Sequence, residues 1–305
     1  MAFKPPDKIT EAGTETGVKK ATLPAGKMLV GSFLAGAYIA FAGIVAISVS
    51  SGLDPKLWGS VPTFFTGIAF VLGLVLVIIA GSELLTGNMA LLPLAALRGR
   101  LGAGQIARNF AIVAIGNLLG ALFVAYFLAV ESGVLTGEPA IERLAAVADK
   151  KAVEESTWQI FLRAIGCNWL VCLAVWMAIA AEDIGGKVLA IFFPIMAFVA
   201  IGFDHVVANM FFLPAAIFAD AGTLNWGDAI HNWIFAFIGN LVGGGVFVGG
   251  AYYYLYGRKE PAKDKTVGDT ERTGDGRFAG DGSMISARGY REDRAGTGAV
   301  PAGRR

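Results

Sequence analysis

The chain has 305 residues, 55% of them hydrophobic, and its mean hydropathy is +0.61. Charged residues make up only 16% of the chain, well below the roughly one quarter that is usual in soluble domains. This composition excludes an ordinary soluble domain and indicates a polytopic membrane protein with polar ends, and the net charge of +1 gives no indication of nucleic-acid binding.

The first 130 residues predict a polar leader followed by three membrane spans. Residues 1–27 hold five lysines and show no cleavable signal peptide. Spans are expected at about 28–49 and 106–130. The apolar block between them, 61–97, is too long for one span of about 20 residues. Because Glu83 to Gly87 interrupts this block, we expect a helix, an irregular loop and a half-helix there.

The rest of the chain predicts three more spans and two polar segments. The longest internal connection, 131–155, contains six acids and leads to a span at about 157–181. A second interrupted block, 187–219, is broken around Asp204 to Ala208, and the sixth span covers about 227–256. Residues 257–305 are rich in Gly, Asp, Arg and Thr, so we expect a disordered cytoplasmic tail.

The two interrupted blocks are copies of each other. Segment 81–93 matches segment 202–214 at a constant offset of 121, and segment 109–118 matches 232–241 at an offset of 123. Since each copy holds three spans, an odd number, the second copy is expected to lie upside down. The predicted fold is therefore an all-α membrane protein with six transmembrane helices in an inverted 3+3 repeat, about 28–130 and 157–256, in which helices 2 and 5 are interrupted.

The second copy places an acid and a histidine at membrane depth. Between Lys187 and Ala219 only Asp204 and His205 are ionisable. Ionisable groups are expensive in the bilayer and usually functional. A lone histidine is more often a satisfied packing residue, but its place in an internal repeat favours a functional role. The two cysteines, Cys167 and Cys172, form no metal-ligand pattern and are interpreted as packing residues.

The distribution of Lys and Arg predicts the orientation. The leader, the connection between the second and third spans, Lys187 and the tail hold most of the basic residues, whereas the opposite side holds only four. Cytoplasmic loops carry the excess of basic residues. Both termini are therefore expected on the cytoplasmic side of the cell membrane.

Three motifs together resemble the formate/nitrite transporter family. They are Gly-Ser-Glu-Leu-Leu-Thr-Gly-Asn at 81–88, Gly-Cys-Asn-Trp-Leu-Val-Cys-Leu-Ala-Val-Trp at 166–176, and Gly-Phe-Asp-His-Val-Val-Ala-Asn-Met-Phe-Phe-Leu-Pro at 202–214. The resemblance covers roughly residues 25–257. It implies an aquaporin-like protomer, a homopentamer with one pore per protomer and a lipid-plugged central axis. It implies small monovalent anions as substrates: formate, nitrite, hydrosulfide, and sometimes acetate or lactate. It implies no cofactor, metal or nucleic-acid partner.

The resemblance also implies roles for individual residues. His205 corresponds to the family's pore histidine, and Thr86 and Asn168 correspond to its hydrogen-bonding neighbours. Leu84 resembles the constriction leucine. The remaining correspondences are the apolar constriction residues Phe70, Leu74 and Phe198 and the vestibule lysine Lys151, which has Lys150 beside it.

Two positions depart from the family's usual pattern. Leu85 stands where formate channels often have Phe, which weakens an assignment to formate alone. Asp204 stands where Glu is more usual, a change that keeps the charge.

The predicted chemistry is protonation-assisted passage of a weak acid. Burying an unpaired ion in an apolar constriction costs far more than burying a neutral acid. A cationic vestibule near Lys151 would concentrate the anion, and desolvation would raise the acid's pKa. The proton could come from His205 or from bulk water, and these alternatives stay open.

Each site residue also has a structural alternative. The apolar residues Phe70, Leu74, Leu84 and Phe198 could simply form the core, and Lys151 could be a solvated loop charge. Thr86 could cap the half-helix that follows it. We expect four polar residues mainly to support the loops: Glu83, Asp204, Asn88 and Asn209.

Two other functions compete with anion transport. An aquaporin-type channel for neutral solutes shares the half-helices, but Asn88 and Asn209 are each followed by Met, and neither interrupted segment contains an arginine. A membrane-embedded enzyme is disfavoured because the sequence has no paired-histidine metal pattern, no Ser/His/Asp set and no cofactor motif. The sequence does not rank formate, nitrite and hydrosulfide.

Overall fold

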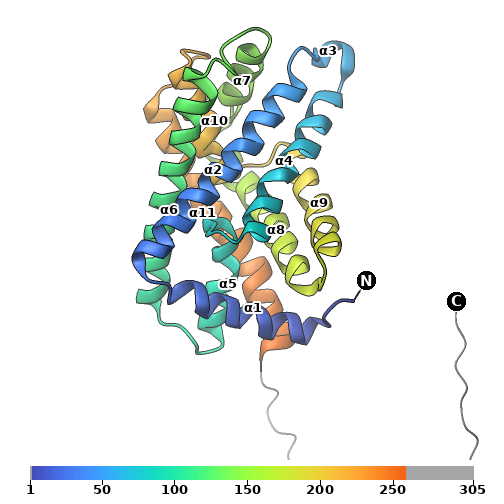
Figure 1. Cartoon of the computed structure of the whole chain (residues 1–305), viewed down its shortest axis with the longest axis vertical. Helices are drawn as coiled ribbons and strands as arrows, with labels where there is room; N and C mark the ends of the chain where they lie inside the picture. Colours follow the sequence, from blue (N-terminus) through green and yellow to red (C-terminus); the bar gives the residue numbers. More distant parts are fainter. Residues whose placement is uncertain (1, 259–305) are drawn as a thin grey trace, which may run out of the picture. The chain divides into compact units, whose positions relative to one another are not determined.

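The computed structural model describes residues 2–258, which are mainly helical (Figure 1). The helices are α1 (Pro6–Ala21), α2 (Ala25–Ser50), α3 (Pro55–Trp58), α4 (Val61–Ala80), α5 (Leu85–Leu97), α6 (Ala103–Phe123), α7 (Ala140–Asp149), α8 (Thr157–Ala180), α9 (Ile184–Ile201), α10 (Val206–Phe218) and α11 (Trp226–Gly244). Four π-helical segments continue or join them: η1 (Val124–Glu131), η2 (Lys150–Glu154), η3 (Gly245–Gly250) and η4 (Tyr253–Gly257). The predicted tail lies outside the described residues apart from its first two positions.

Six helices are long and apolar enough to cross a membrane, which confirms the predicted spans. They are α2, α4, α6 with η1, α8, α9, and α11 with η3 and η4. The remaining apolar helices, α5 and α10, are too short to span and follow α4 and α9 directly. Figure 1 shows α4 descending from the end that holds α3 and α7, whereas α9 rises from the end that holds α1.

The second and fifth helices are interrupted, as expected, but the breaks begin and end earlier than the sequence indicates. Helix α4 ends at Gly81, with φ +80°, and α9 ends at Gly202, with φ +86°. These left-handed conformations favour glycine. The chain becomes helical again at Leu85 and Val206, because side chains from other helices cap the half-helices there. No pattern within the segments themselves could reveal those caps.

Close packing of small residues joins α2 to α6 and α8 to α11. A Cβ atom on Gly36 would lie 2.0 Å from the Asn117 carbonyl oxygen, and one on Gly120 would lie 2.0 Å from the Phe33 carbonyl oxygen. In the other pair, a Cβ atom on Gly239 would lie 2.4 Å from the Phe161 carbonyl oxygen. Small residues let membrane helices approach until their backbones touch.

Helix α1 packs under one end of the bundle. Figure 1 shows it running across the foot of the spanning helices. A Cβ atom on Gly17 would lie 2.4 Å from the carbonyl oxygen of Leu91 in α5. The leader is thus a packed helix whose Lys20 reaches Glu83 in the loop before α5, while α7 covers the opposite end of the bundle.

Replacing Gly36 by alanine should loosen the packing of α2 on α6. The added methyl group has no room beside Asn117, and overpacking of this kind costs about 1–3 kcal/mol. We expect Gly36→Ala to lower the thermal unfolding temperature of the purified protein. Gly104→Ala is the matched control, because nothing lies within 4 Å of its Cβ position. If both variants unfold at the same temperature as the wild type, this backbone contact is dispensable.

Candidate functional site

Three cavities lie in series through the bundle. The cavity on the α7 side, here called the outer cavity, has a volume of about 110 Å³; the middle cavity has about 10 Å³; and the cavity on the α1 side, here called the inner cavity, has about 20 Å³. Phe70, Phe198 and His205 line both the outer and the middle cavity. Leu74 and Leu84 line both the middle and the inner cavity. The path through the protomer therefore has two constrictions, one on each side of a nearly closed centre.

The outer constriction is built from stacked rings. Phe70 and Phe198 meet edge to face, with ring centroids 6.1 Å apart, and Phe198 stacks on His205 at 5.9 Å. Phe212 stacks on Phe70, and their ring centroids are also 6.1 Å apart. All four side chains are at most 5% exposed. Aromatic packing of this kind fixes ring positions, so the constriction has a defined shape.

His205 is held by both of its ring nitrogens. Nδ1 accepts a hydrogen bond from the Ala208 N–H at 3.1 Å and so caps α10, while Nε2 lies 2.8 Å from the Thr86 hydroxyl. A nitrogen that accepts an N–H carries no proton, so the neutral ring holds its proton on Nε2 and donates it to Thr86. A second proton could enter the ring only if the cap broke. Thr86 itself lies within α5 and does not cap it.

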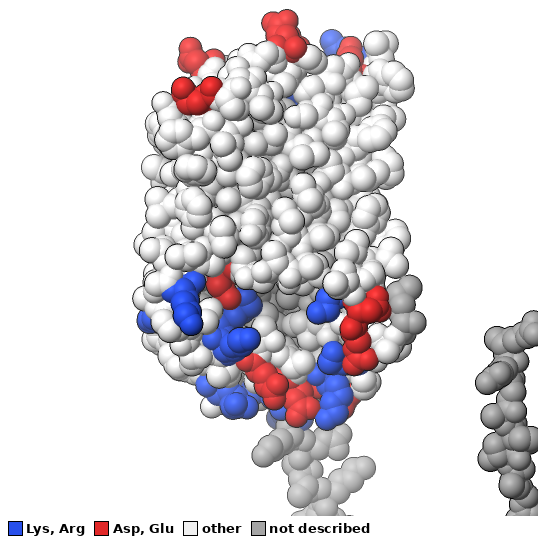
Figure 2. Space-filling view, in the orientation of Figure 1, with Lys and Arg blue, Asp and Glu red and all other residues white. Residues whose placement is uncertain are grey.

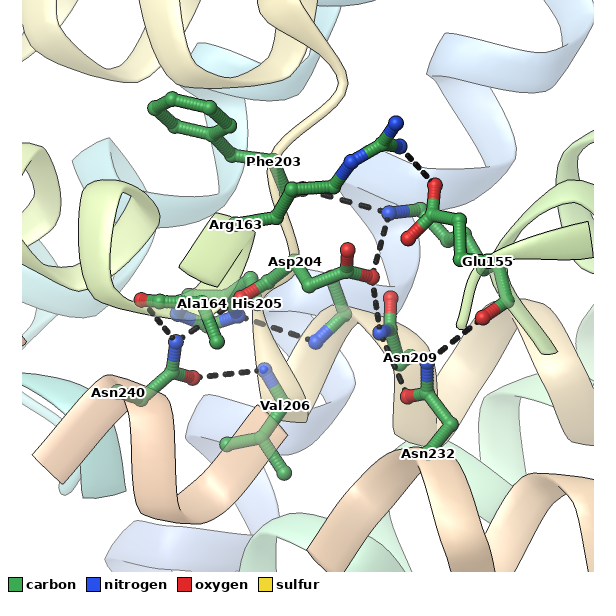
Figure 3. A network of polar contacts seen from close by, with 12 residues as sticks. Glu155, Arg163, Ala164, Phe203, Asp204, His205, Val206, Asn209, Asn232 and Asn240 are labelled. Atoms are coloured by element: carbon green, nitrogen blue, oxygen red, sulfur yellow. Dashed lines mark hydrogen bonds and ion pairs between the residues drawn. The ribbon is translucent and has the colours of Figure 1, made fainter. Parts of the chain in front are cut away.

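Each helix break is closed by one asparagine from a neighbouring spanning helix. Asn240 donates to the carbonyl oxygens of Asp204 at 2.9 Å and Ala164 at 2.8 Å, and its side-chain oxygen accepts from the Val206 N–H at 2.9 Å (Figure 3). In the other copy, the side chain of Asn117 makes the same three kinds of bond, at 2.9, 2.8 and 2.9 Å, to Glu83, Ser32 and Leu85. These bonds satisfy the backbone groups that the breaks leave free.

The acid within each break pairs with a lysine and an asparagine. Asp204 lies 2.9 Å from the Lys151 ammonium and accepts from Asn209 at 2.9 Å. Asn209 also donates to Asn232, whose amide donates to the Lys151 carbonyl oxygen at 3.0 Å (Figure 3). Of the two neighbouring lysines, it is therefore Lys151 that reaches the loop; Lys150 also lines the outer cavity.

The first copy repeats this arrangement with a residue that the sequence analysis missed. Glu83 lies 3.0 Å from the ammonium group of Lys20, on α1, and accepts from Asn88 at 3.3 Å. Asn88 also donates to Asn109, which donates to the Lys20 carbonyl oxygen at 3.2 Å. Lys20 lines the inner cavity. It lies in the leader, outside the matched segments, so only the packing of α1 reveals it as the counterpart of Lys151.

Asn88 and Asn209 support the loops and also line the path. Their amide nitrogens donate to acids, which fixes the orientation of each amide. Within residues 2–258 the amide oxygen of each is buried and has no hydrogen-bond partner. Asn209 lines the outer cavity and Asn88 the inner one. Each cavity is thus lined by an asparagine whose amide is fixed by a neighbouring acid.

The structure brings most of the predicted pore residues to this path, but not all of them. Leu85, Thr86 and Asn168 do not line the three cavities described above. The Asn168 amide donates to the carbonyl oxygens of Thr86 at 3.2 Å and Asn240 at 2.7 Å, and so braces both halves. Thr86 reaches the path through His205. Leu85 is fully buried in the core.

The outer cavity also contains a buried acid that the sequence analysis did not single out. Glu155 is 7% exposed and accepts a hydrogen bond from Arg163 (Figure 3). Within residues 2–258, Oε2 of Glu155 and Oδ2 of Asp204 are buried and have no hydrogen-bond partner. Burial raises the pKa of Glu155 to about 8; the negative charge of the neighbouring Asp204 adds to the shift, and Lys151 and Arg163 oppose it. Burial therefore favours the protonated form of Glu155.

Replacing Glu155 by glutamine should flatten the dependence of stability on pH. The pKa in the folded protein is raised from an ordinary value of 4.5 to about 8. Between these values the folded protein holds a proton that the unfolded chain has released, so wild-type stability falls as pH rises through this window. We expect the thermal unfolding temperature of Glu155→Gln to fall less between pH 5 and 9. The exposed neighbour provides the control, Glu154→Gln, which should follow the wild type; parallel curves for all three proteins would contradict the assignment.

Comparison with known proteins places the chain in a family. The sequence matches the formate/nitrite transporter family over residues 7–254. It is 49% identical over 263 residues to an uncharacterized transporter, YrhG, of Bacillus subtilis (strain 168), covering 86% of this chain and 97% of that protein. It is 46% identical over 271 residues to a probable formate transporter of Methanothermobacter thermautotrophicus, covering 84% and 98%. A solved pentameric formate channel with formate bound superposes with a TM-score of 0.67 at 31% identity, covering 77% of this chain and 98% of that one. The chain therefore belongs to the formate/nitrite transporter family of multi-pass membrane proteins.

Proposed function

We propose that the protein conducts small monovalent anions of weak acids across the cytoplasmic membrane, formate foremost, and that they pass the centre of the pore as neutral acids. The observation that carries this proposal is the lining of the middle cavity. Seven of its eight lining residues are apolar, and the eighth is His205, whose ring is neutral in its hydrogen-bonded state. Such a centre favours a neutral acid over an ion.

The outer end of the path suits the anion rather than the acid. Lys150 lines the outer cavity and forms no ion pair among the described residues, whereas Lys151 and Lys20 line the outer and inner cavities with their charges paired to Asp204 and Glu83. A cation without an acid partner raises the local concentration of anions. As the anion gives up water at a constriction, its own pKa rises, because desolvation disfavours the charged form. Protonation then removes the charge that would otherwise block the apolar centre.

The hydrogen bonds of His205 favour solvent as the proton source. Its Nδ1 is occupied by the Ala208 N–H, so in this state the ring has no second proton to give. Water in the outer cavity can deliver a proton to the anion before the constriction. His205 and Thr86 then supply neutral hydrogen-bonding groups to the acid as it passes.

The proposed assembly is a homopentamer with both termini in the cytoplasm. A related solved channel is pentameric, and apolar side chains such as Leu119, Phe127 and Val246 are exposed on the protomer. Lipid is proposed to fill the central axis. On the face shown in Figure 2, charged side chains gather at the two ends, and most Lys and Arg lie at the end that holds α1. An excess of basic residues marks the cytoplasmic side.

The same pore is compatible with two alternative functions. Nitrite or hydrosulfide could be the main substrate, since both are anions of weak acids, and one relative is named a nitrite transporter, from Salmonella typhimurium (strain LT2). A neutral-solute channel is the other. Proteoliposomes assayed at two pH values, with internal pH recorded, separate them: a neutral-solute channel would let liposomes swell without pH-linked anion movement.

Replacing His205 by asparagine should keep the fold and change the pH dependence of transport. We expect wild-type formate uptake to increase as pH falls, first because solvent protonates the anion, and at low pH also because a second proton on His205 breaks its hydrogen bond to Ala208 and charges the constriction. Asparagine can accept the Ala208 N–H as an N-cap but cannot titrate, so the His205→Asn profile should lack the second contribution and be flatter. The measurement is formate and nitrite flux against pH at matched protein incorporation. The other histidine of the chain, exposed on α11, provides the control, His231→Asn. Superimposable profiles for His205→Asn and wild type would reduce His205 to a structural group.

A further inference from the structure

Arg143, on α7, lines the outer cavity but belongs to none of the networks described above. Its Nε donates to the Ser50 hydroxyl at 3.0 Å and its Nη2 to the Thr66 hydroxyl at 3.4 Å. Among residues 2–258 it forms no ion pair. The guanidinium thus brings an uncompensated positive charge to the cavity wall.

The two hydroxyl groups hold this guanidinium in one place. Ser50 donates its own proton to the Ala46 carbonyl oxygen at 2.8 Å, and Thr66 donates to the Pro62 carbonyl oxygen at 2.8 Å. Each oxygen is therefore free to accept from Arg143. Ser50 is fully buried and Thr66 is 8% exposed. The arginine is positioned by neutral groups, and the N–H groups of Nη1 have no partner in the described part of the chain.

Three cationic side chains line the outer cavity: Arg143, Lys150 and Lys151. The charge of Lys151 is compensated by Asp204. Lys150 is exposed at the rim. Burial lowers the pKa of Arg143 from its ordinary value, but an arginine side chain remains protonated in proteins. A partly buried cation without a fixed counter-ion is costly, and a mobile anion would relieve that cost.

We propose that Arg143 is the anion-binding residue of the outer cavity and that it takes a planar, two-oxygen monoanion, a carboxylate or nitrite. Arginine presents parallel N–H groups that match two such oxygens, whereas a lysine is only a point charge. One water needs roughly 10–15 Å³ of this kind of space, so a cavity of about 110 Å³ admits a small oxoanion together with water.

This assignment rests on the proposed transport function and adds a preference to it. Hydrosulfide has a single acceptor atom and cannot engage both arms of the guanidinium. Selection for oxoanions over hydrosulfide is then made at Arg143, before the constriction at His205, and the apolar centre need only distinguish neutral species from ions.

The test compares Arg143→Lys, which keeps the charge and removes the fork, with Arg143→Gln, which removes both. In proteoliposomes, Arg143→Lys should raise the half-saturating concentrations of formate and nitrite roughly tenfold. The half-saturating concentration of hydrosulfide should change less than twofold. Arg143→Gln should raise all three. Lys150→Gln is the charge-matched control, and it should shift formate and hydrosulfide by the same small factor.

A binding measurement keeps the two proposals separate. Saturation-transfer NMR with ¹³C-formate on the detergent-solubilised oligomer should give a signal for wild type that weakens in Arg143→Lys. If wild type binds formate but moves neither formate nor nitrite, the transport function fails and the anion site stands. If formate gives no signal at millimolar concentration, or if formate and hydrosulfide shift equally in Arg143→Lys, the site at Arg143 is wrong.

A second variant guards against misfolding of Arg143→Lys. Thr66→Val keeps the arginine and nearly the same side-chain volume but removes one of the hydroxyl groups that hold the guanidinium. It should raise half-saturating formate about two- to threefold, since a hydrogen bond to a charged group is lost, and leave hydrosulfide unchanged. An unchanged half-saturating formate concentration in a correctly assembled Thr66→Val protein would contradict positioning of the fork.

Discussion

The structure depends on how two helix breaks are satisfied away from water. In a membrane, an unpaired backbone N–H or C=O costs several kcal/mol. Asn117 and Asn240 meet this requirement, because each gives two donors and one acceptor to the chain around one break. Once the breaks are held in this way, the loops that carry Glu83 and His205 have fixed positions, and the constrictions follow from them.

The two halves use the same contacts but end in different cavities. The same network of a lysine, an acid and two asparagines lies beside both breaks. Its lysine is Lys20 in the first copy and Lys151 in the second. Only the outer side adds Glu155 and Arg143, carried by the connection between the halves. The outer cavity is accordingly the larger, at about 110 Å³ against about 20 Å³ for the inner one. The two copies of the repeat thus support cavities of different size at the two ends of the path.

Apolar periodicity and the internal repeat predicted the six spans and both breaks, because those features depend on the residues of each segment. The family resemblance, not periodicity, supplied most of the residues of the path. The sequence did not indicate Lys20, Glu155 or Arg143 as site residues. They lie in polar segments whose position is set only by packing of α1, α7 and η2 against the bundle. The placing of Leu85 also escaped prediction, because its direction depends on a helix start that Asn117 determines from α6.

In the proposed transport function, charge recognition and charge exclusion occupy separate places along the path. The cations of the outer cavity attract an anion, but none of them lines the middle cavity, where His205 is the one polar side chain among the lining residues. An anion bound at the mouth therefore gains nothing by entering as an ion and loses its hydration. A weak acid can exchange that hydration for a proton, whereas a strong acid's anion cannot at physiological pH. Separation of the two steps lets one protomer attract anions and still resist a simple leak of ions.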